Sequence, residues 1–319
     1  MTSLTARSVG VAISAIVPVI LAAGTIMPAS ACTTHQAGAA AGSAAPATAP
    51  ATRSGPGRAG TARAHSAQVP SYSHIVVVME ENHSYSQIIG NSQAPYINSL
   101  AKKGALFTNS HAITHPSEPN YMAITSGSTY GLSSDVCPFT TSKANIGSEL
   151  IAAKLSYADY SESMPSRGYE RCTNGEYARK HNPAANYTDL PASVNQTFAQ
   201  FPRSSAYASL PAVSFVDPNL LDDMHDGTIA AGDSWLKTNM GSYVTWATRH
   251  NSLLIVTWDE NDGSPGNKIA TIFAGAHVKA GKYSERVTHY RVLRTLEQAY
   301  GLKALGKSAS TTPITDAFN

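Results

Sequence analysis

Polar residues of a few chemical types are gathered in four short segments of this sequence. Carboxylates, amides and imidazoles are concentrated in residues 80–83, 114–120, 217–227 and 259–262. Carboxylate and amide oxygens suit hard divalent cations, and imidazoles suit zinc, iron or manganese. One such segment is typical of a turn or a helix cap, but four together indicate a shared site. We therefore expect metal-assisted chemistry that uses one or two divalent ions, whose identity the residues do not fix.

Ser117 is the candidate nucleophile of this set. It offers a hydroxyl among carboxylates and histidines, follows Pro116 and precedes a stretch with helical character. At a helix N-terminus the free backbone N–H groups and the helix dipole favour both an alkoxide and a bound phosphate. The residues alone leave one alternative open, which is that Ser117 is an ordinary N-cap serine.

Short apolar runs alternate with helical patterns along the chain. We expect strands at residues 74–79, 106–107, 212–216, 253–258 and 270–274, and helices at residues 96–103, 121–125, 146–155, 235–250 and 290–300. This alternation predicts an α/β fold with a mostly parallel sheet covered on both faces. In such sheets ligands bind outside the carboxyl ends of the strands, which is where the polar segments fall.

The first residues have the pattern of an export signal. Arg7 precedes an apolar run over residues 9–27, and the small residues 29–31 follow it. We predict a signal peptide at residues 1–31; a membrane anchor is the alternative, but Pro18 breaks the run. Residues 32–68 are rich in Ala, Thr, Gly, Ser and Pro and predict a flexible linker. The folded domain should span residues 69–319.

The sequence holds three cysteines, which agree with an oxidising compartment. Cys137 and Cys172 lie inside the predicted domain and could form a disulfide. Cys32 follows the expected cleavage point directly, as the acylated cysteine of a bacterial lipoprotein does, although Ala29 stands where a larger aliphatic residue is usual. Ordinary cleavage and lipidation both remain open, so we expect either a secreted protein or a cell-surface lipoprotein.

The composition excludes some partners. Hydrophobic residues make up 42% and charged residues 14% of the 319-residue chain, which predicts a sizeable core. The net charge of +2 is too small to bind nucleic acid or an anionic membrane by electrostatics. We therefore expect a membrane contact only through a lipid anchor, and the sequence does not indicate an oligomeric state.

Longer motifs in the folded region resemble a known family. Residues 74–84 and 115–121 look like the signatures of the bacterial and fungal phosphoesterase family, which contains acid phosphatases and phospholipases C. Five further motifs match in order, at residues 160–165, 180–183, 222–226, 258–260 and 288–290. The family is a branch of the alkaline phosphatase superfamily, so the resemblance implies an alkaline phosphatase-like three-layer sandwich.

The resemblance also implies roles for single residues. Ser117 would contact a metal ion and attack phosphorus, and the implied protein ligands of that ion are Glu81, Asn82, Asp259 and Glu260. Glu80 and Glu81 are adjacent, so either could be the glutamate ligand. We choose Glu81 because it adjoins Asn82. Asn120 would hold a phosphate oxygen, by analogy with the nucleotide pyrophosphatases.

For the histidines the resemblance implies more than one role. His225, Asp226 and His289 would lie near a second metal site, or contact phosphate, or protonate the leaving group. We assign His225 and His289 to proton transfer and Asp226 to the substrate. We also assign His181 and His115 to the substrate pocket, although His115 could instead pack against the fold.

The expected activity is hydrolysis of a phosphoric ester through a phosphoserine. The first hypothesis is an acid phosphatase of broad range that acts on phosphate monoesters. The second is a phospholipase C that cleaves phospholipid headgroups and should show an apolar rim around its site. The third is a non-catalytic surface-binding module, which predicts a gap in the constellation that the sequence does not show.

Overall fold

The computed structural model describes residues 68–319. The predicted signal peptide, nearly all of the predicted linker and Cys32 lie outside the described residues. Within residues 68–319, none of the helices combines the length and apolar character that crossing a membrane requires.

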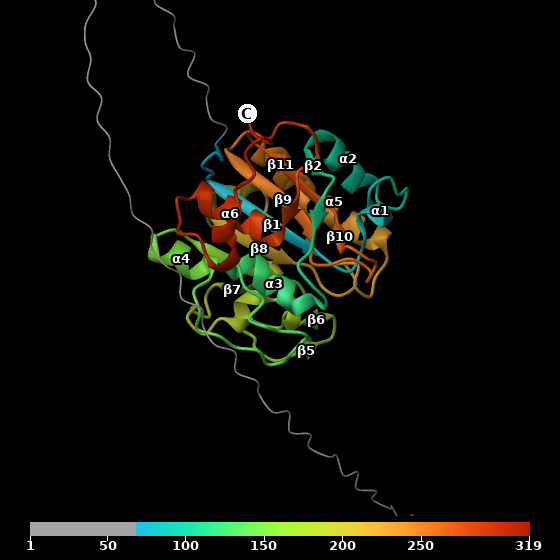
Figure 1. Ribbon diagram of the computed structural model, residues 1–319. Coiled ribbons are helices and arrows are strands. Elements are labelled where there is room, and N and C mark those ends of the chain that lie inside the picture. Colours follow the sequence, from blue (N-terminus) through green and yellow to red (C-terminus); the bar gives the residue numbers. More distant parts are fainter. Residues whose placement is uncertain (1–67) are drawn as a thin grey trace, which may run out of the picture. The chain divides into compact units, whose positions relative to one another are not determined.

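A central sheet of eight strands organises the domain (Figure 1). All neighbouring strands are parallel except at β11, which is antiparallel to both of its neighbours. In spatial order the strands are β12 (Gly281–Tyr283), β2 (Ala105–Phe107), β11 (Thr271–Gly275), β9 (Ser252–Trp258), β1 (His74–Glu80), β8 (Val213–Asp217), β4 (Tyr157–Ser161) and β7 (Asn195–Thr197). The prediction of a mostly parallel sheet is confirmed.

Helices cover both faces of this sheet, because its central strands are apolar on both sides. In β1, Val76 and Val78 face one core, whereas Ile75, Val77 and Met79 face the other. The first core is closed by α2 (Pro95–Lys103) and α5 (Ile229–Ala247), and the second by α3 (Ser117–Ser126), α4 (Ile146–Ala152) and α6 (His289–Ala299). The predicted three-layer sandwich is therefore present.

The helix predictions differ from the structure mainly at their ends. The helix expected from residue 235 begins at Ile229, because the Thr228 side chain caps it by accepting from the Ala231 N–H. The helix expected to reach residue 155 ends at Ala152.

The route of the chain to Ser117 also differs from the prediction. We expected residues 114–120 to follow the strand at residues 106–107, which is β2. The chain instead leaves the central sheet and forms β3 (Ser110–His111) in a small sheet with β10 (Lys268–Ile269) and β13 (Val287–Thr288). A loop then leads from β3 into α3.

Shorter elements complete the described chain. They are α1 (Tyr85–Ile88), the hairpin of β5 (Thr173–Asn174) and β6 (Tyr177–Ala178), and the 3-10 helices η1 (Arg179–His181), η2 (Pro183–Asn186), η3 (Phe198–Gln200), η4 (Ser204–Ser209) and η5 (Gly306–Ser310). A disulfide joins Cys137 to Cys172, with 5.7 Å between their Cα atoms. The predicted pairing of these cysteines is confirmed.

Candidate active site

The carboxyl ends of three parallel strands bring the acidic residues together. The Glu81 N–H donates to the Asp223 carbonyl at 2.8 Å, and the Asp259 N–H donates to the Glu80 carbonyl at 2.8 Å. The second bond continues the pairing of β1 with β9 beyond the strands, and the first ties the residue after β1 to the loop that follows β8. The residues that follow each strand are thereby fixed side by side at one edge of the sheet.

Glu80 and Glu81 are both fully buried but point to opposite sides of β1. Glu80 follows Val76 and Val78 on the face covered by α2 and α5, and neither of its carboxylate oxygens has a hydrogen-bond partner. Glu81 points toward α3 and contacts Ser117. The structure thus places Glu81, rather than Glu80, beside the candidate nucleophile.

Ser117 is the first residue of α3 and is only 1% exposed. Its Oγ lies 3.0 Å from Oε2 of Glu81 and 3.3 Å from Oε1 of Glu260. Pro116 takes the N-cap position, and the cap makes no side-chain hydrogen bond. The alternative of an ordinary N-cap serine is therefore wrong, because the hydroxyl is directed to carboxylates outside the helix.

The second oxygen of Glu81 is held by an aromatic pair. The Tyr121 hydroxyl donates to Oε1 at 2.6 Å, and Nε2 of His181 lies 3.1 Å from the same oxygen. The two rings are stacked, with 5.4 Å between their centroids. On its other side, His181 Nδ1 is 3.0 Å from Oδ2 of Asp223. A carboxylate that holds one ring nitrogen, as Asp223 holds Nδ1, is the arrangement that orients a metal-ligating histidine, and it leaves Nε2 directed to the Glu81 carboxylate.

This geometry corrects the expectation for His181. The side chain is 3% exposed and both ring nitrogens face carboxylates, so it belongs to the acidic centre rather than to a substrate pocket. Tyr121 and Asp223 were not identified as site residues from the sequence. Both lie in the family-like motifs, but their part depends on contacts with residues far away in the chain.

His225 lies beside His181 and is held by a lysine. The two imidazole centroids are 5.3 Å apart, and Lys180 Nζ lies 3.1 Å from Nε2 of His225. An ammonium group can only donate, so Nε2 accepts and the ring proton is on Nδ1, 2.7 Å from Oδ1 of Asp226. Lys180 also pairs with Asp135 at 3.0 Å. The Asp226 side chain itself is 55% exposed.

One group of residues in the described part of the chain has the geometry to hold a metal ion. Glu81, His181 and His225 each offer a ligand atom, and these atoms lie within 4.8 Å of one another. Only Glu81 of this group was expected to be a ligand. The sequence could not reveal the other two as a pair, because they come from η1 and from the loop after β8.

The remaining expected ligands lie close to Ser117 or to one another. Asn82 has a left-handed backbone (φ 53°), and this turn directs its N–H to Oδ1 of Asp259 at 3.1 Å. Asp259 is fully buried, and its Oδ2 has no hydrogen-bond partner. Glu260 contacts Ser117 and also Nδ1 of His115, whose side chain is 42% exposed. His115 therefore points toward the site rather than into a core.

Two expected roles conflict with the hydrogen bonding. His289 is 1% exposed, its Nε2 donates to the Asp259 carbonyl at 2.6 Å, and burial lowers its pKa to about 4. A neutral imidazole held by the Asp259 carbonyl favours a role in positioning Asp259 over the expected proton transfer. The Asn120 amide accepts from two backbone N–H groups and donates to two carbonyls of residues 113–116. It shapes the loop before Ser117 and has no free donor for phosphate.

The electrostatics of the carboxylates fit a bound cation. Burial raises the pKa of Glu81 well above its ordinary value, and the charges of Asp259 and Asp223 add to the effect. Burial also raises the pKa of Asp259 to about 8 and that of Glu260 to about 7. Without a counter-ion, the ionised forms of these groups are disfavoured. A divalent cation would favour their ionised forms, and the oxygen and imidazole donors present suit it.

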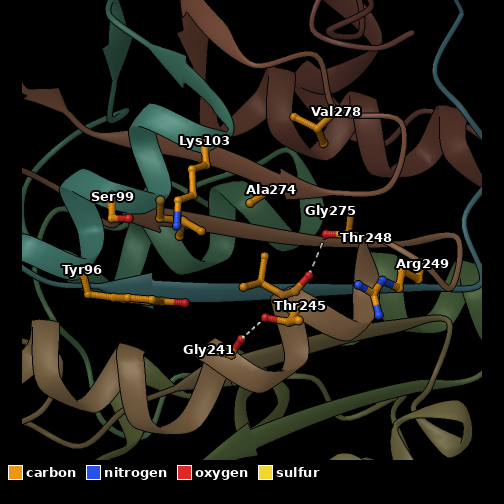
Figure 2. A pocket seen from close by; sticks show the side chains of 12 residues that line it. Tyr96, Ser99, Lys103, Gly241, Thr245, Thr248, Arg249, Ala274, Gly275 and Val278 are labelled. Atoms are coloured by element: carbon orange, nitrogen blue, oxygen red, sulfur yellow. Dashed lines mark hydrogen bonds between the residues drawn. The ribbon is translucent and has the colours of Figure 1, made fainter.

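One cavity of the domain lies away from this site. It has a volume of about 440 Å³ between α2, α5 and β11, and Figure 2 shows Tyr96, Lys103 and Arg249 among the side chains around it. Gly275 in its wall pairs with Leu253 near the start of β9, whereas Asp259 follows the end of that strand. The cavity is therefore at the opposite edge of the sheet and contains none of the expected site residues.

Solved structures define the class of this fold. A protein of the alkaline phosphatase superfamily from Vibrio parahaemolyticus matches with a TM-score of 0.54 and 11% identity, covering 77% of this chain and 71% of that chain. Murine ectonucleotide pyrophosphatase / phosphodiesterase 5 matches with a TM-score of 0.51 and 10% identity, covering 78% of this chain and all of that chain. The domain therefore has the α/β fold of the alkaline phosphatase superfamily.

Sequence relatives narrow this class. Residues 91–303 match the Phosphoesterase family, and the chain belongs to that family. It is 48% identical over 254 residues to a phosphatidylinositol-3-phosphatase of Mycobacterium tuberculosis, covering 79% of this chain and 85% of the relative. It is 31% identical over 229 residues to an acid phosphatase of Aspergillus fumigatus, covering 65% of this chain and 51% of the relative. The protein is thus a hydrolase that acts on phosphoric esters.

Proposed function

We propose that this protein is an exported, metal-dependent phosphomonoesterase of the acid phosphatase type that works through a phosphoserine at Ser117. The observation that carries the proposal is the placement of the Ser117 hydroxyl. It lies at the N-terminus of α3, within 3.3 Å of carboxylates from two different strand ends. A nucleophile in contact with bases, at the positive end of a helix, fits attack on a phosphoryl group.

The group of Glu81, His181 and His225 would hold a divalent cation, and Asp259, Glu260 and Asn82 are the further ligands that we propose around it. The buried oxygen of Asp259 without a partner and the raised pKa values of the carboxylates support this assignment. A cation bound there would lower the pKa of the Ser117 hydroxyl and offset charge on the phosphoryl oxygens.

The residues of the chain then have separate tasks. Glu260 is positioned to accept the Ser117 proton, because its Oε1 lies 3.3 Å from the Ser117 hydroxyl. The Ser117 oxygen bonds to phosphorus while the bond from phosphorus to the ester oxygen breaks. The Lys180 ammonium is the proton source for the leaving alcohol, since it lies beside His225 at the acidic centre. Water then displaces Ser117 from phosphorus and releases phosphate.

Two side chains favour the monoester over the diester hypothesis. A phosphate monoester carries one charge more than a diester and needs additional cationic contacts. Lys180 supplies a cation next to His225, and His115, which contacts Glu260, would supply a second one when its ring is protonated. The name of the Mycobacterium tuberculosis relative makes phosphatidylinositol 3-phosphate one monoester to assay.

We also propose that the protein is exported, and that residues 69–319 form the catalytic domain behind a linker at residues 32–68. The signal-peptide pattern at residues 1–31 supports export. A lipid on Cys32 would keep the protein at the cell surface, and its absence would release it. Mass spectrometry of the exported protein distinguishes the two forms by the mass of the N-terminal peptide.

Phosphate release from p-nitrophenyl phosphate, compared with cleavage of p-nitrophenyl phosphorylcholine, tests the activity. The proposal predicts turnover of the monoester, little turnover of the diester, and no turnover of either by Ser117→Ala. Preferred cleavage of the diester would favour the phospholipase C hypothesis. Absence of both activities in protein reconstituted with Zn²⁺, Mn²⁺, Mg²⁺ or Ca²⁺ would favour the non-catalytic module.

A further inference from the structure

A small apolar cavity adjoins the candidate active site. It has a volume of about 210 Å³. Most of its wall is apolar and is formed by Val136, the Cys137–Cys172 disulfide, Ala178 and Leu220. Lys180 and His225 line the same cavity. We call this cavity the leaving-group pocket, for the reasons given below.

The wall of the leaving-group pocket is fixed to the helix that carries Ser117. The Val136 N–H donates to Oε2 of Glu118 at 2.6 Å, and the Glu118 N–H donates to Oδ1 of Asp135 at 3.0 Å. Asp135 in turn pairs with Lys180. Because Glu118 directly follows Ser117, these bonds hold the apolar wall in a defined position relative to the nucleophile.

His225 connects the pocket to the acidic centre. Its ring lies 5.3 Å from that of His181, which contacts Glu81, and Glu81 contacts Ser117. The ester oxygen that leaves phosphorus has to meet a proton donor, and Lys180, which is hydrogen-bonded to His225, is that donor in the proposed function. The carbon group on this oxygen would therefore extend into the cavity that Lys180 and His225 line.

The apolar surface around the pocket is unusual for this domain. Among the described residues, the exposed large hydrophobic side chains are Val136 (39%), Leu221 (45%) and Ile151 (41%). Val136 lines the pocket and Leu221 follows the lining residue Leu220, whereas Ile151 lies on α4 and is not part of the lining. Two of these three exposed apolar side chains thus lie in the pocket lining or directly beside it.

We propose that the leaving-group pocket receives the alcohol part of the substrate and selects phosphomonoesters with an aromatic or other apolar leaving group over those with a small polyol. This inference rests on the proposed function, because it concerns the same site. The size agrees, since an apolar cavity of about 150 Å³ accommodates benzene. Lys180 and His225 are the lining residues suited to the ester oxygen; the other polar lining residues are Asp135, which pairs with Lys180, and Thr173.

Phosphate release from phenyl phosphate and from glycerol 2-phosphate measures this preference as a ratio of kcat/KM values. The variant is Val136→Ser, which keeps the backbone N–H bonded to Glu118 but removes apolar surface from the pocket. We expect the ratio to fall roughly threefold to tenfold, from the burial of part of a valine side chain. Ile151→Ser is the matched control, with an equally exposed aliphatic side chain elsewhere, and should keep the wild-type ratio. Val136→Leu retains an apolar wall and should keep or raise the preference for phenyl phosphate.

The outcomes separate this inference from the proposed function. If the wild-type protein releases phosphate from neither substrate, the proposed function fails. If it hydrolyses both, but Val136→Ser leaves the ratio unchanged, the assignment of the pocket is overturned. An equal loss on both substrates also overturns it, since damage to the fold does not distinguish leaving groups. The thermal unfolding midpoint of each variant checks that the fold is kept.

Discussion

The Ser117 hydroxyl lies 3.0 Å from a carboxylate oxygen of Glu81, a residue 36 positions earlier in the chain. The other oxygen of the same carboxylate contacts His181 and Tyr121. One buried carboxylate thus joins the candidate nucleophile to the imidazole that could bind a metal ion. A substitution that changes the contact of Glu81 with Ser117 should therefore also affect its contact with His181, and the reverse.

Replacement of Ser117 by alanine should abolish turnover and leave the fold intact. The side chain contributes its hydroxyl to the site and packs little volume, so we expect a fall in kcat of at least about 10³-fold. Wild-type protein quenched during turnover should carry phosphate on Ser117, which peptide mass spectrometry detects. Ser126→Ala, at the other end of α3, should behave as wild type. Full activity in Ser117→Ala would contradict a serine nucleophile.

Removal of divalent cations should abolish activity and destabilise the protein. The buried carboxylates around Glu81 lose their counter-ion, and a cation that binds only the folded state stabilises it by about 2.7 kcal/mol at a concentration 100 times its Kd. The unfolding midpoint should therefore fall in chelator and recover when a divalent ion is added back. Elemental analysis identifies the ion. A chelated protein with unchanged activity and midpoint would rule out a metal centre.

Asp223→Asn should weaken metal binding without removing a proposed ligand. Asp223 accepts from Nδ1 of His181 and from the His225 backbone N–H, so it orients two members of the metal-binding group. Loss of such a partner lowers metal affinity or activity by roughly 10–100-fold. Titration of the metal-free protein measures the affinity, with Asp222→Asn as the neighbouring control. Equal affinities in the two variants would show that Asp223 does not orient the group.

The double change Cys137→Ser and Cys172→Ser should lower the free energy of unfolding by about 3–4 kcal/mol, because the bond closes a long loop in the unfolded chain. The two residues are 35 positions apart. Urea unfolding measures the change, and Cys32→Ser is the control. If reduction of the wild-type protein leaves the urea midpoint unchanged, the disulfide contributes no stability.

Ionisation of the buried Asp217 carboxyl should make the protein less stable as the pH rises. Burial raises the pKa of Asp217 well above its ordinary value, and the charge of Asp159 on the neighbouring strand β4 adds to the effect. The unfolded chain releases this proton near pH 4 and the folded protein only at higher pH. The contribution of Asp217 to the free energy of unfolding is therefore fully present below about pH 4. It decreases as the pH rises toward the folded-state pKa, by ~1.4 kcal/mol per pH unit at most.

Asp217→Asn should flatten this dependence, since the amide does not titrate. Urea unfolding at several pH values between about 4 and 8, with chelator present throughout, compares it with the exposed control Asp316→Asn. A variant whose stability falls with pH as steeply as that of the wild type would contradict the assignment.

The central strands and their order in the chain could be predicted, because β1 and β9 contain continuous apolar runs and β8 contains an apolar run interrupted only by Ser214. The strand β4 was missed, since Tyr157–Ser161 contains no β-branched run and includes the buried Asp159. The separate sheet that carries β3 toward Ser117 was also missed. Its strands are two residues long, too short to leave a periodic pattern.

The sequence by itself determined the chemistry that is available: a hydroxyl before a helix, and acidic and imidazole side chains at the ends of apolar strands. Those features are local, and local residue patterns are enough to reveal them. The tertiary structure decided which oxygen faces which partner. It directed Glu81 rather than Glu80 to Ser117, closed His181 between Glu81 and Asp223, and committed His289 and Asn120 to backbone groups. Such choices depend on strand register and on contacts between distant segments, and a linear pattern does not contain them.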